Sequence, residues 1–290
     1  MTQENQVDQS FTFPGEQNYL WLFDDVAALV AEGRFKSGEA HFIAQGRQEM
    51  ADGRRQASIR KRLAGQWLRG DGIEIGALHN PLNVMSSTTR VRYVDRLDEQ
   101  DLRDHYPELA AHRLAPISII DDGETLNSLP DNSQDFVIAN HVIEHTEDPI
   151  GALNTWFRVI RPGGILYLAA PDKRFTFDNN RVNTPWIHLV ADHTCGAEGS
   201  RKQHFEEWVR YIGNERDYGQ IEASVARLMA QNYSIHFHVW DAENFTNFLN
   251  NYRESYNGAF ILKEFQLNVA SQEFIYLLEK TAAADATLAA

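Results

Sequence analysis

Short apolar runs alternate with helical patterns between residues 73 and 170, and this alternation constrains the fold more than any other feature. The runs are Ile73–Ala77, Val91–Val94, Pro116–Ile120, Phe136–Ala139 and Ile165–Ala170. Apolar runs of this length are typical of buried strands. Strands joined by crossover segments form a parallel sheet with right-handed connections, and such sheets bind ligands beyond the carboxyl ends of their strands. The sequence therefore predicts an α/β fold with its ligand site at that edge.

Helical patterns flank the predicted sheet. Apolar residues recur at helical spacing through residues 17–69, so we expect a helical N-terminal extension over residues 1–70, ended by Gly70-Asp71-Gly72. A further helix is expected over Asp148–Ile160, where Arg161-Pro162-Gly163-Gly164 stops helical propagation. The core would then span residues 71–172.

The C-terminal part predicts a completion of the core after an insertion. Residues 173–240 fit neither the strand nor the helix alternation and are interpreted as an insertion after the fifth strand. Residues 241–280 predict a helix at Asp241–Ser255 followed by an antiparallel hairpin of Phe260–Val269 and Glu273–Glu279. The Ala-rich residues 281–290 are expected to form a frayed tail.

Charge and composition exclude several classes of partner. Forty-one acidic and 27 basic residues give a formal net charge of −14, which repels a nucleic-acid backbone. No apolar run has the length of a membrane span, and the first residues lack the pattern of a signal peptide. Cys195 is the only cysteine, so no intrachain disulfide can form. We expect a cytoplasmic protein without a nucleic-acid partner, and the sequence leaves a homo-oligomer open.

Acidic residues follow the first three predicted strands. Glu74 lies two positions before Gly76 at the end of the first strand, and Asp95 ends the second strand. An acid at the second position can accept both hydroxyls of a ribose. Asp122 follows the third strand, beside Gly123, where an adenine amino group could be met.

With the motifs that follow, these residues resemble the class I S-adenosylmethionine-dependent methyltransferase family. The resemblance covers residues 72 to 172 and the terminal hairpin. It is carried by Asp122–Leu126, by the segment from Asn140 to His145 that contains His-Val-Ile-Glu-His, and by Arg158-Val-Ile-Arg-Pro-Gly-Gly164. It implies a Rossmann-like, mostly parallel sheet with a terminal antiparallel hairpin.

The resemblance also implies a cofactor, S-adenosyl-L-methionine, and the residues that bind it. The expected cofactor-binding residues are Glu74, Gly76, Ala77, Asp95, Asp122, Gly123, Asn140 and His141. Glu74 and Gly76 would face the aminoacyl end, Asp95 the ribose, Asp122 and Gly123 the adenine, and Asn140 and His141 the methionine side. Carboxylates and backbone carbonyls accept hydrogen bonds from the cofactor's ammonium and hydroxyl donors.

The glycine loop departs from the family pattern. Leu78 and Asn80 replace the usual second and third glycines, and the segment after Pro81 is short and polar for the usual crossover helix. Because a dinucleotide pyrophosphate depends on that glycine-rich turn, the departure disfavours a nicotinamide-dependent sugar oxidoreductase. That enzyme and a noncatalytic cofactor-binding module are the two alternatives to a methyltransferase.

Histidines supply the candidate acceptor site. Five of the 11 histidines lie in the insertion. Methyl transfer to a hydroxyl or amine benefits from a base, so His145 and His238 are the candidate catalytic residues, although a histidine in His-Val-Ile-Glu-His can also serve structure or the cofactor. His204 and His236 are candidate acceptor-binding residues.

The His236-Phe-His238 segment alternates like a strand, which would place both imidazoles on one face. Such a pair could bind a divalent metal, with His188, His204 or Asp192 as a further ligand, hold an anionic acceptor, or pack at a domain seam. Soft ligands are absent from the segment, so a metal is not favoured and none is assigned.

Basic residues after the fifth strand offer a second acceptor contact. Lys173, Arg174 and Arg181 could bind a phosphate or carboxylate at the carboxyl edge of the sheet, and Arg174 is the one we assign to the acceptor. The alternative is a hydrated loop with surface ion pairs. The wider pattern also resembles methyltransferases associated with polysaccharide and glycan synthesis. These resemblances imply methyl transfer to oxygen or nitrogen of a small-molecule or glycan-type acceptor, and we expect residues 173–240 to form its cap.

Overall fold

The structure is a computed structural model that describes residues 11–213, 215–256 and 258–282. The chain forms two compact units. One comprises residues up to Leu68 together with Leu82–Thr88, and the other comprises Arg69–Pro81 and everything from Thr89 on. Residues 1–10 of the expected extension and 283–290 of the expected tail lie outside the described residues.

The described part of the first unit contains helices between Glu16 and Trp67, where the sequence predicts helical spacing. Its helices are α1 (Glu16–Leu22), α2 (Asp24–Ala31), α3 (Gly38–His41), α4 (Arg47–Ala51) and α5 (Ile59–Trp67), with a π-helical turn at Phe42–Gly46 between α3 and α4. Tyr19, Phe23, Val26 and Phe42 form its buried core. The Tyr19 hydroxyl lies 3.0 Å from His41 Nδ1, which gives the buried phenol a polar partner.

The second unit contains a seven-stranded sheet in the order β3-β2-β1-β4-β5-β7-β6. Its strands are β1 (Gly70–Ile75), β2 (Thr89–Asp95), β3 (Ile117–Ile120), β4 (Gln134–Asn140), β5 (Ile160–Pro171), β6 (Phe260–Asn268) and β7 (Glu273–Lys280). The first five strands pair in parallel, and β7 pairs antiparallel with both β5 and β6. The predicted parallel sheet with a terminal antiparallel hairpin is therefore confirmed.

The strand order reverses between β1 and β4. The chain runs outward from β1 to β3 and then returns to the other side of β1 to form β4. Open α/β sheets bind ligands beside the carboxyl ends of the strands at such a switch point. Close approach of the two strands depends on Gly72, because a Cβ there would clash with the Phe136 ring and backbone oxygen.

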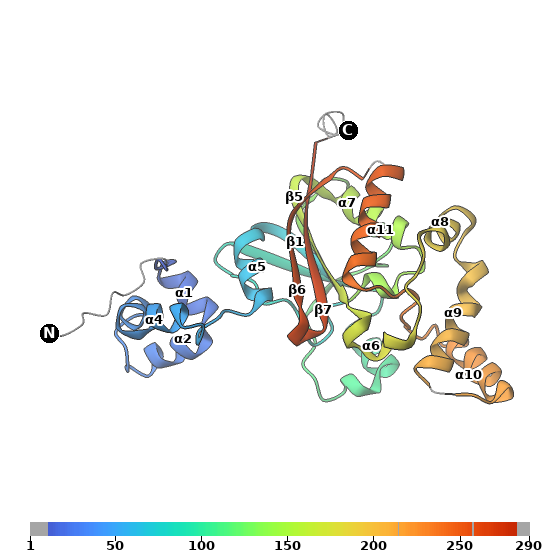
Figure 1. The fold of residues 1–290 in the computed structure, drawn as a ribbon, viewed down its shortest axis with the longest axis horizontal. Helices are drawn as coiled ribbons and strands as arrows, with labels where there is room; N and C mark the ends of the chain where they lie inside the picture. Colours follow the sequence, from blue (N-terminus) through green and yellow to red (C-terminus); the bar gives the residue numbers. More distant parts are fainter. Residues whose placement is uncertain (1–10, 214, 257, 283–290) are drawn as a thin grey trace. The chain divides into compact units, whose positions relative to one another are not determined.

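Helices α7 (Pro149–Val159) and α11 (Ala242–Ser255) lie beside the sheet (Figure 1). Large apolar residues of both helices belong to the main core. Trp156 from α7 and Phe245 from α11 are both fully buried in the main core. Asp148 caps α7 by accepting from the Gly151 amide, as the sequence predicts for a helix that starts there. Between β2 and β3 lies a helix that the apolar pattern did not predict, α6 (Glu99–His105), capped by Asp98.

The insertion folds into helices α8 (Trp186–Cys195), α9 (Glu198–Tyr211) and α10 (Tyr218–Ala230), which follow one another at the right of Figure 1. The expected strand around His236 and His238 is wrong: residues 233–239 form no strand pairing, and Trp240 makes a single bridge to Asp172. The backbone of this segment instead bonds to the main core, where the Phe237 amide donates to the Glu144 carbonyl at 2.7 Å. The alternation therefore does not bring His236 and His238 together.

Two predicted boundaries also shift. β1 already begins at Gly70, so Gly70-Asp71-Gly72 starts the strand rather than separating it from the preceding helix. Ile160 and the following Arg161–Gly164 belong to β5, where Gly163 adopts a φ of 81°. The proline and glycines thus end α7 and pass directly into an irregular start of the strand.

The Gly72 contact gives a stability test. We expect Gly72→Ala to destabilise the protein by about 1–3 kcal/mol, because the added methyl group must displace Phe136 in a close-packed sheet. Gly199→Ala in α9 is the matched control, because a Cβ there meets nothing within 4 Å and alanine favours the helix. Urea unfolding of both variants measures the difference, and equal midpoints would contradict the proposed packing.

Candidate active site

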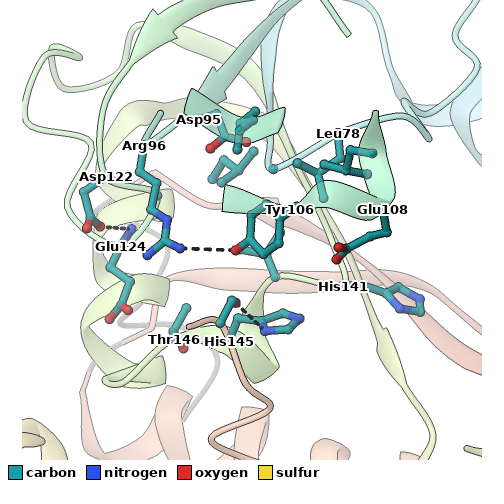
Figure 2. Close-up of a pocket in the computed structure, with 17 residues that line it drawn as sticks. Leu78, Asp95, Arg96, Tyr106, Glu108, Asp122, Glu124, His141, His145 and Thr146 are labelled. Carbon is teal, nitrogen blue, oxygen red and sulfur yellow. Dashed lines mark hydrogen bonds between the residues drawn. The ribbon is translucent and has the colours of Figure 1, made fainter. Parts of the chain in front are cut away.

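A cavity of about 340 Å³ lies at the carboxyl ends of the central strands (Figure 2). Its volume falls within the range of roughly 300–1,000 Å³ that is typical of small-molecule sites. Strands β1 and β2, helix α6 with the segment after it, the turn after β3 and the segment after β4 all contribute to its wall. The lining residues are Ile75, Gly76, Leu78, Asp95, Arg96, Leu102, Tyr106, Glu108, Leu109, Asp122, Gly123, Glu124, His141, Val142, His145, Thr146 and Ser234.

Asp95 lies where the sequence predicts it, at the end of β2 and in the cavity wall. The amide of Leu97 donates a long 3.4 Å hydrogen bond to one of its carboxylate oxygens. Burial raises the pKa of this carboxyl, and backbone amides of the following turn partly offset the effect. Partial burial therefore makes Asp95 a strong acceptor for a ligand that brings its own donors.

The turn after β3 presents Asp122, Gly123 and Glu124 to the cavity. Asp122 accepts from the Glu124 amide at 2.7 Å, while Asp121 closes the turn by accepting from both the amide and the hydroxyl of Ser128. Gly123 is required because a Cβ there would lie 2.7 Å from Ile75 Cγ2. Glu124 accepts from two amides at the start of α7, those of Glu147 and Asp148, and burial raises its pKa to about 7.

Three positions around the cavity have left-handed backbone conformations. Gly76, Leu78 and His141 have φ values of 61°, 46° and 53°, and all three line the cavity. A leucine or histidine there is strained, and such strain concentrates at functional sites. Leu78, which replaces the second glycine of the family pattern, therefore keeps a backbone conformation that glycine favours and adds an apolar side chain to the cavity wall.

Two predicted cofactor residues form a buried layer behind the cavity rather than its surface. Glu74 is 1% exposed, and Asn140 Nδ2 donates to its carboxylate at 3.4 Å. Asn140 Oδ1 is buried and accepts no hydrogen bond. Ala77 lies beside a much smaller void of about 10 Å³ that Asp95 also lines.

His141 and His145 form part of the wall after β4, and Figure 2 shows His145 below Tyr106 and Asp95 above it. His141 Nε2 lies 2.9 Å from Glu273 Oε2, so it donates to a carboxylate that is fully buried. His145 Nδ1 lies 2.9 Å from the Ile235 carbonyl oxygen. A carbonyl can only accept, so Nδ1 carries the proton and Nε2 keeps its lone pair.

His145 is neutral at physiological pH. Burial, reinforced by the neighbouring His236, lowers its pKa to about 3. Its side chain nevertheless remains 31% exposed, and the residue lines the cavity. A neutral imidazole with a free Nε2 in a cavity wall can accept a proton from a bound ligand.

The other predicted acceptor residues do not line the cavity. His236 packs edge-on against His145, with 4.7 Å between ring centroids, and bonds Asp178 at 2.6 Å. His204 and His238 are buried in a separate cluster of histidines. Arg174 makes two hydrogen bonds to the buried Asp172 carboxylate.

Lys173 and Arg181, the other two basic residues expected at the acceptor site, are also engaged elsewhere. Lys173 donates to the Asn179 carbonyl, and the buried Arg181 pairs with Asp178 and Glu207.

One wall of the cavity, formed after β2, was not predicted from the sequence. Tyr106 and Glu108 follow α6, and the Tyr106 hydroxyl accepts from Arg96 at 3.2 Å. The signal was present, because Asp98 caps the amides of Gln100 and Asp101 in the manner of a helix start. Ser234 was also missed, since only the long-range contact of the insertion with His145 brings it to the cavity.

A family model described as a methyltransferase domain matches residues 76–168, the part of the chain that carries most of these lining residues. The central unit is a class I S-adenosylmethionine-dependent methyltransferase domain. The chain is therefore an enzyme whose cofactor is S-adenosylmethionine. The methyltransferase sheet is the one described above, with its switch point at the cavity.

Solved structures are similar to this methyltransferase over most of its length. One is a SAM-dependent methyltransferase from Aquifex aeolicus, with 12% identity, 76% of this chain and 87% of that chain covered, and a TM-score of 0.39. Another is a Thermotoga maritima methyltransferase described as a possible histamine N-methyltransferase, with 14% identity, coverage of 83% and 97%, and a TM-score of 0.40.

A Rhodobacter sphaeroides protein provisionally assigned as a Zn-dependent alcohol dehydrogenase has 14% identity, coverage of 78% and 92%, and a TM-score of 0.47. These identities and TM-scores are low, so none of the three structures carries an argument about activity. A search of curated proteins finds no match.

The residues of the site fit the cofactor. Asp95 offers a partly buried carboxylate, and the unpartnered Asn140 Oδ1 offers an acceptor directly behind the cavity wall. The glycine conformation at Gly76 leaves room for a ligand against the backbone. Among the described residues, no helix combines the length and the apolar character needed to cross a membrane.

Glu124 gives a pH test of this site. Its pKa is about 7 in the folded chain and about 4.5 as the ordinary value, so the folded state holds the proton more tightly. Glu124 therefore stabilises the fold fully below about pH 4.5, and this contribution is lost as the pH rises to 7. Relative to Glu124→Gln, the wild type should lose stability between pH 5 and pH 8, as measured by urea unfolding. If the difference in unfolding free energy between the wild type and Glu124→Gln does not change with pH, burial does not raise the pKa of Glu124.

Proposed function

We propose that this methyltransferase transfers a methyl group to a hydroxyl or amine of a small-molecule or glycan-type acceptor, with His145 as the base. The observation that carries the proposal is the neutral imidazole of His145, a residue that lines the cavity: its Nδ1 is fixed by the Ile235 carbonyl, and its Nε2 keeps its lone pair. S-adenosylmethionine supplies a methyl group activated by its sulfonium. An oxygen that acquires this methyl group becomes strongly acidic, so a base of low pKa is sufficient.

The charges around the cavity favour an acceptor without phosphate. Of the acids that line the cavity, Glu108 and Asp122 are exposed, whereas burial raises the pKa of Asp95 and Glu124. Arg96 is the single arginine among the lining residues, and its guanidinium contacts Tyr106. The whole chain carries a net charge of −14. A polyanionic acceptor would be repelled from this wall, whereas a neutral or cationic hydroxyl or amine compound would not.

We assign the cofactor to the wall opposite His145. Asp95 would accept from the ribose hydroxyls, and Asp122 with Gly123 would contact the adenine. Gly76 and Ala77 would lie along the aminoacyl part, which the buried Glu74 and Asn140 support from behind. His141, held by Glu273, would complete the methionine side.

The insertion would act as the cap over the acceptor end. Ser234 lines the cavity, and its hydroxyl lies 2.9 Å from His145 Nδ1. The ring of His236 packs against the ring of His145 and would hold this base in place. In this proposal His236 does not contact the acceptor. Arg174, His204 and His238 are engaged elsewhere, so the acceptor role expected for them passes in this proposal to Ser234 and the wall around Tyr106.

The cofactor assignment predicts the effect of Asp95→Ala. This substitution should weaken S-adenosylmethionine binding by about 1–3 kcal/mol, because two hydroxyls lose a charged acceptor in a partly buried site. Asp122→Ala should have a smaller effect. Asp71→Ala is the control, because it removes the same charge at the amino end of β1, where Asp71 pairs with Arg90. Calorimetry that finds equal affinities for Asp95→Ala and the control would remove Asp95 from the cofactor site.

The base assignment predicts the effect of His145→Gln. Formation of S-adenosylhomocysteine is followed with a panel of sugars, phenols and amines, since this product reports turnover whatever the acceptor. With an active acceptor, kcat should fall by about 10²–10⁴-fold while cofactor affinity changes little. His193→Gln is the matched control, because His193 pairs with Asp148 away from the cavity. An unchanged kcat in His145→Gln would contradict the role of His145 as the base and would mean that solvent takes up the acceptor's proton.

A further inference from the structure

Four potential metal ligands converge inside the insertion, outside the proposed active site. His188 and Asp192 lie one turn apart on α8, His204 lies on α9, and His238 lies in the segment after α10. One ligand atom from each lies within 4.8 Å of the others. None of these residues lines the cavity, and none has a part in the methyl-transfer chemistry proposed above.

The distances match the spacing of ligands around one ion. His188 Nε2 lies 3.0 Å from His204 Nε2 and 3.1 Å from Asp192 Oδ2. Asp192 Oδ2 lies 3.9 Å from both His204 Nε2 and His238 Nε2. Tetrahedral ligands at the bond lengths of zinc lie about 3.3 Å from one another. The observed separations bracket that value and need only small side-chain adjustments.

The carboxylate in this cluster has one oxygen without a hydrogen bond. Asp192 is 4% exposed, and Ser200 Oγ donates to its Oδ1 at 2.7 Å. Its Oδ2 is buried and accepts no hydrogen bond, yet it faces three imidazole nitrogens. A buried carboxylate oxygen without a partner is costly unless a cation or donor compensates it. The Ser200 contact orients the carboxylate as supporting residues do in metal sites.

The His238 imidazole has few competing partners. Its Nδ1 is buried and makes no hydrogen bond within the described part of the chain. Among the described residues, the hydrogen bond that competes for His238 Nε2 is a long one, 3.4 Å, to the Glu147 carbonyl.

We propose that His188, Asp192, His204 and His238 form a structural site for one divalent transition metal, of which zinc fits the ligand set best. Three imidazoles and one carboxylate in tetrahedral spacing suit zinc, and four protein ligands close the coordination sphere as in structural sites. The partly exposed His188, at 26%, provides the entry path. The site goes beyond the proposed function, because it does not depend on which acceptor is methylated.

The site would join three segments of the insertion, of which α8 packs on the main core through Leu189. The hydrophobic cluster of the insertion lies between α9 and α10 and does not include α8. A metal would tie α8 to α9 and to His238, four residues after the Ser234 that lines the cavity. Metal binding would thus stabilise the cap and fix the segment that contacts His145.

Metal content and titration of the full chain test the proposal. Purified wild type, stripped with a chelator and dialysed against zinc, should retain about one equivalent per chain by elemental analysis. Cobalt should give the visible absorption of a tetrahedral site. His188→Asn and Asp192→Asn keep most of the side-chain volume, and each should weaken zinc binding by at least about tenfold and abolish the cobalt spectrum. His193→Gln, on the same helix but outside the cluster, is the control and should bind as the wild type does.

A second group of potential ligands, Glu144, His145 and His236, makes a further variant necessary. His236→Gln should leave zinc binding intact. Loss of zinc in His236→Gln with retention in His188→Asn and Asp192→Asn would overturn the proposal, as would a folded wild type that binds no zinc. Zinc should also raise the melting temperature of the wild type and the His193→Gln control but not of Asp192→Asn. These readouts do not involve turnover, so they stand or fall separately from the methyl-transfer proposal.

Discussion

The pairing of β1 with β4 is the constraint on which the rest of the structure depends. Gly72 faces Phe136 across this pair, and the sheet reverses its order there. The reversal leaves the carboxyl ends of both strands uncovered by a crossover connection, and this geometry creates a cavity before any particular side chain is placed. The topology provides the cavity. Its acidic residues, its left-handed backbone positions and His145 then determine which ligands the cavity can bind.

A second interaction connects this site to the insertion. The Glu144 carbonyl accepts from the Phe237 amide, and the Ile235 carbonyl in turn fixes His145 Nδ1. The two contacts run in opposite directions between adjacent residues of the two segments, so each segment sets the position of the other. The tautomer of His145 is therefore decided by a residue of the insertion that is 90 positions away in sequence.

The sequence predicts what depends on local periodicity and fails where long-range packing decides. The strands from β1 to β7 have regular apolar patterns, and Gly76, Asp95, Asp122, Gly123, His141 and His145 all line the cavity as expected from strand ends. Glu74 and Asn140 share those strand ends but lie behind the wall. His236 and His238 alternate in sequence like a strand, yet no partner strand exists in the described chain to impose that conformation, so their imidazoles join different clusters. The spacing of apolar residues along a segment does not show which other segment it will pack against in the folded chain.

Burial sets the charge of this cavity more than the count of acidic residues does. Glu124 lines the cavity and Glu144 lies directly behind it, and burial raises the pKa of both, while burial lowers the pKa of His145. Each group is thus shifted toward its neutral form. Asp122, which is exposed, offers a carboxylate oxygen at the cavity wall. An acidic chain can in this way present a wall that attracts a sulfonium, beside an imidazole that accepts a proton only when the acceptor becomes acidic during transfer.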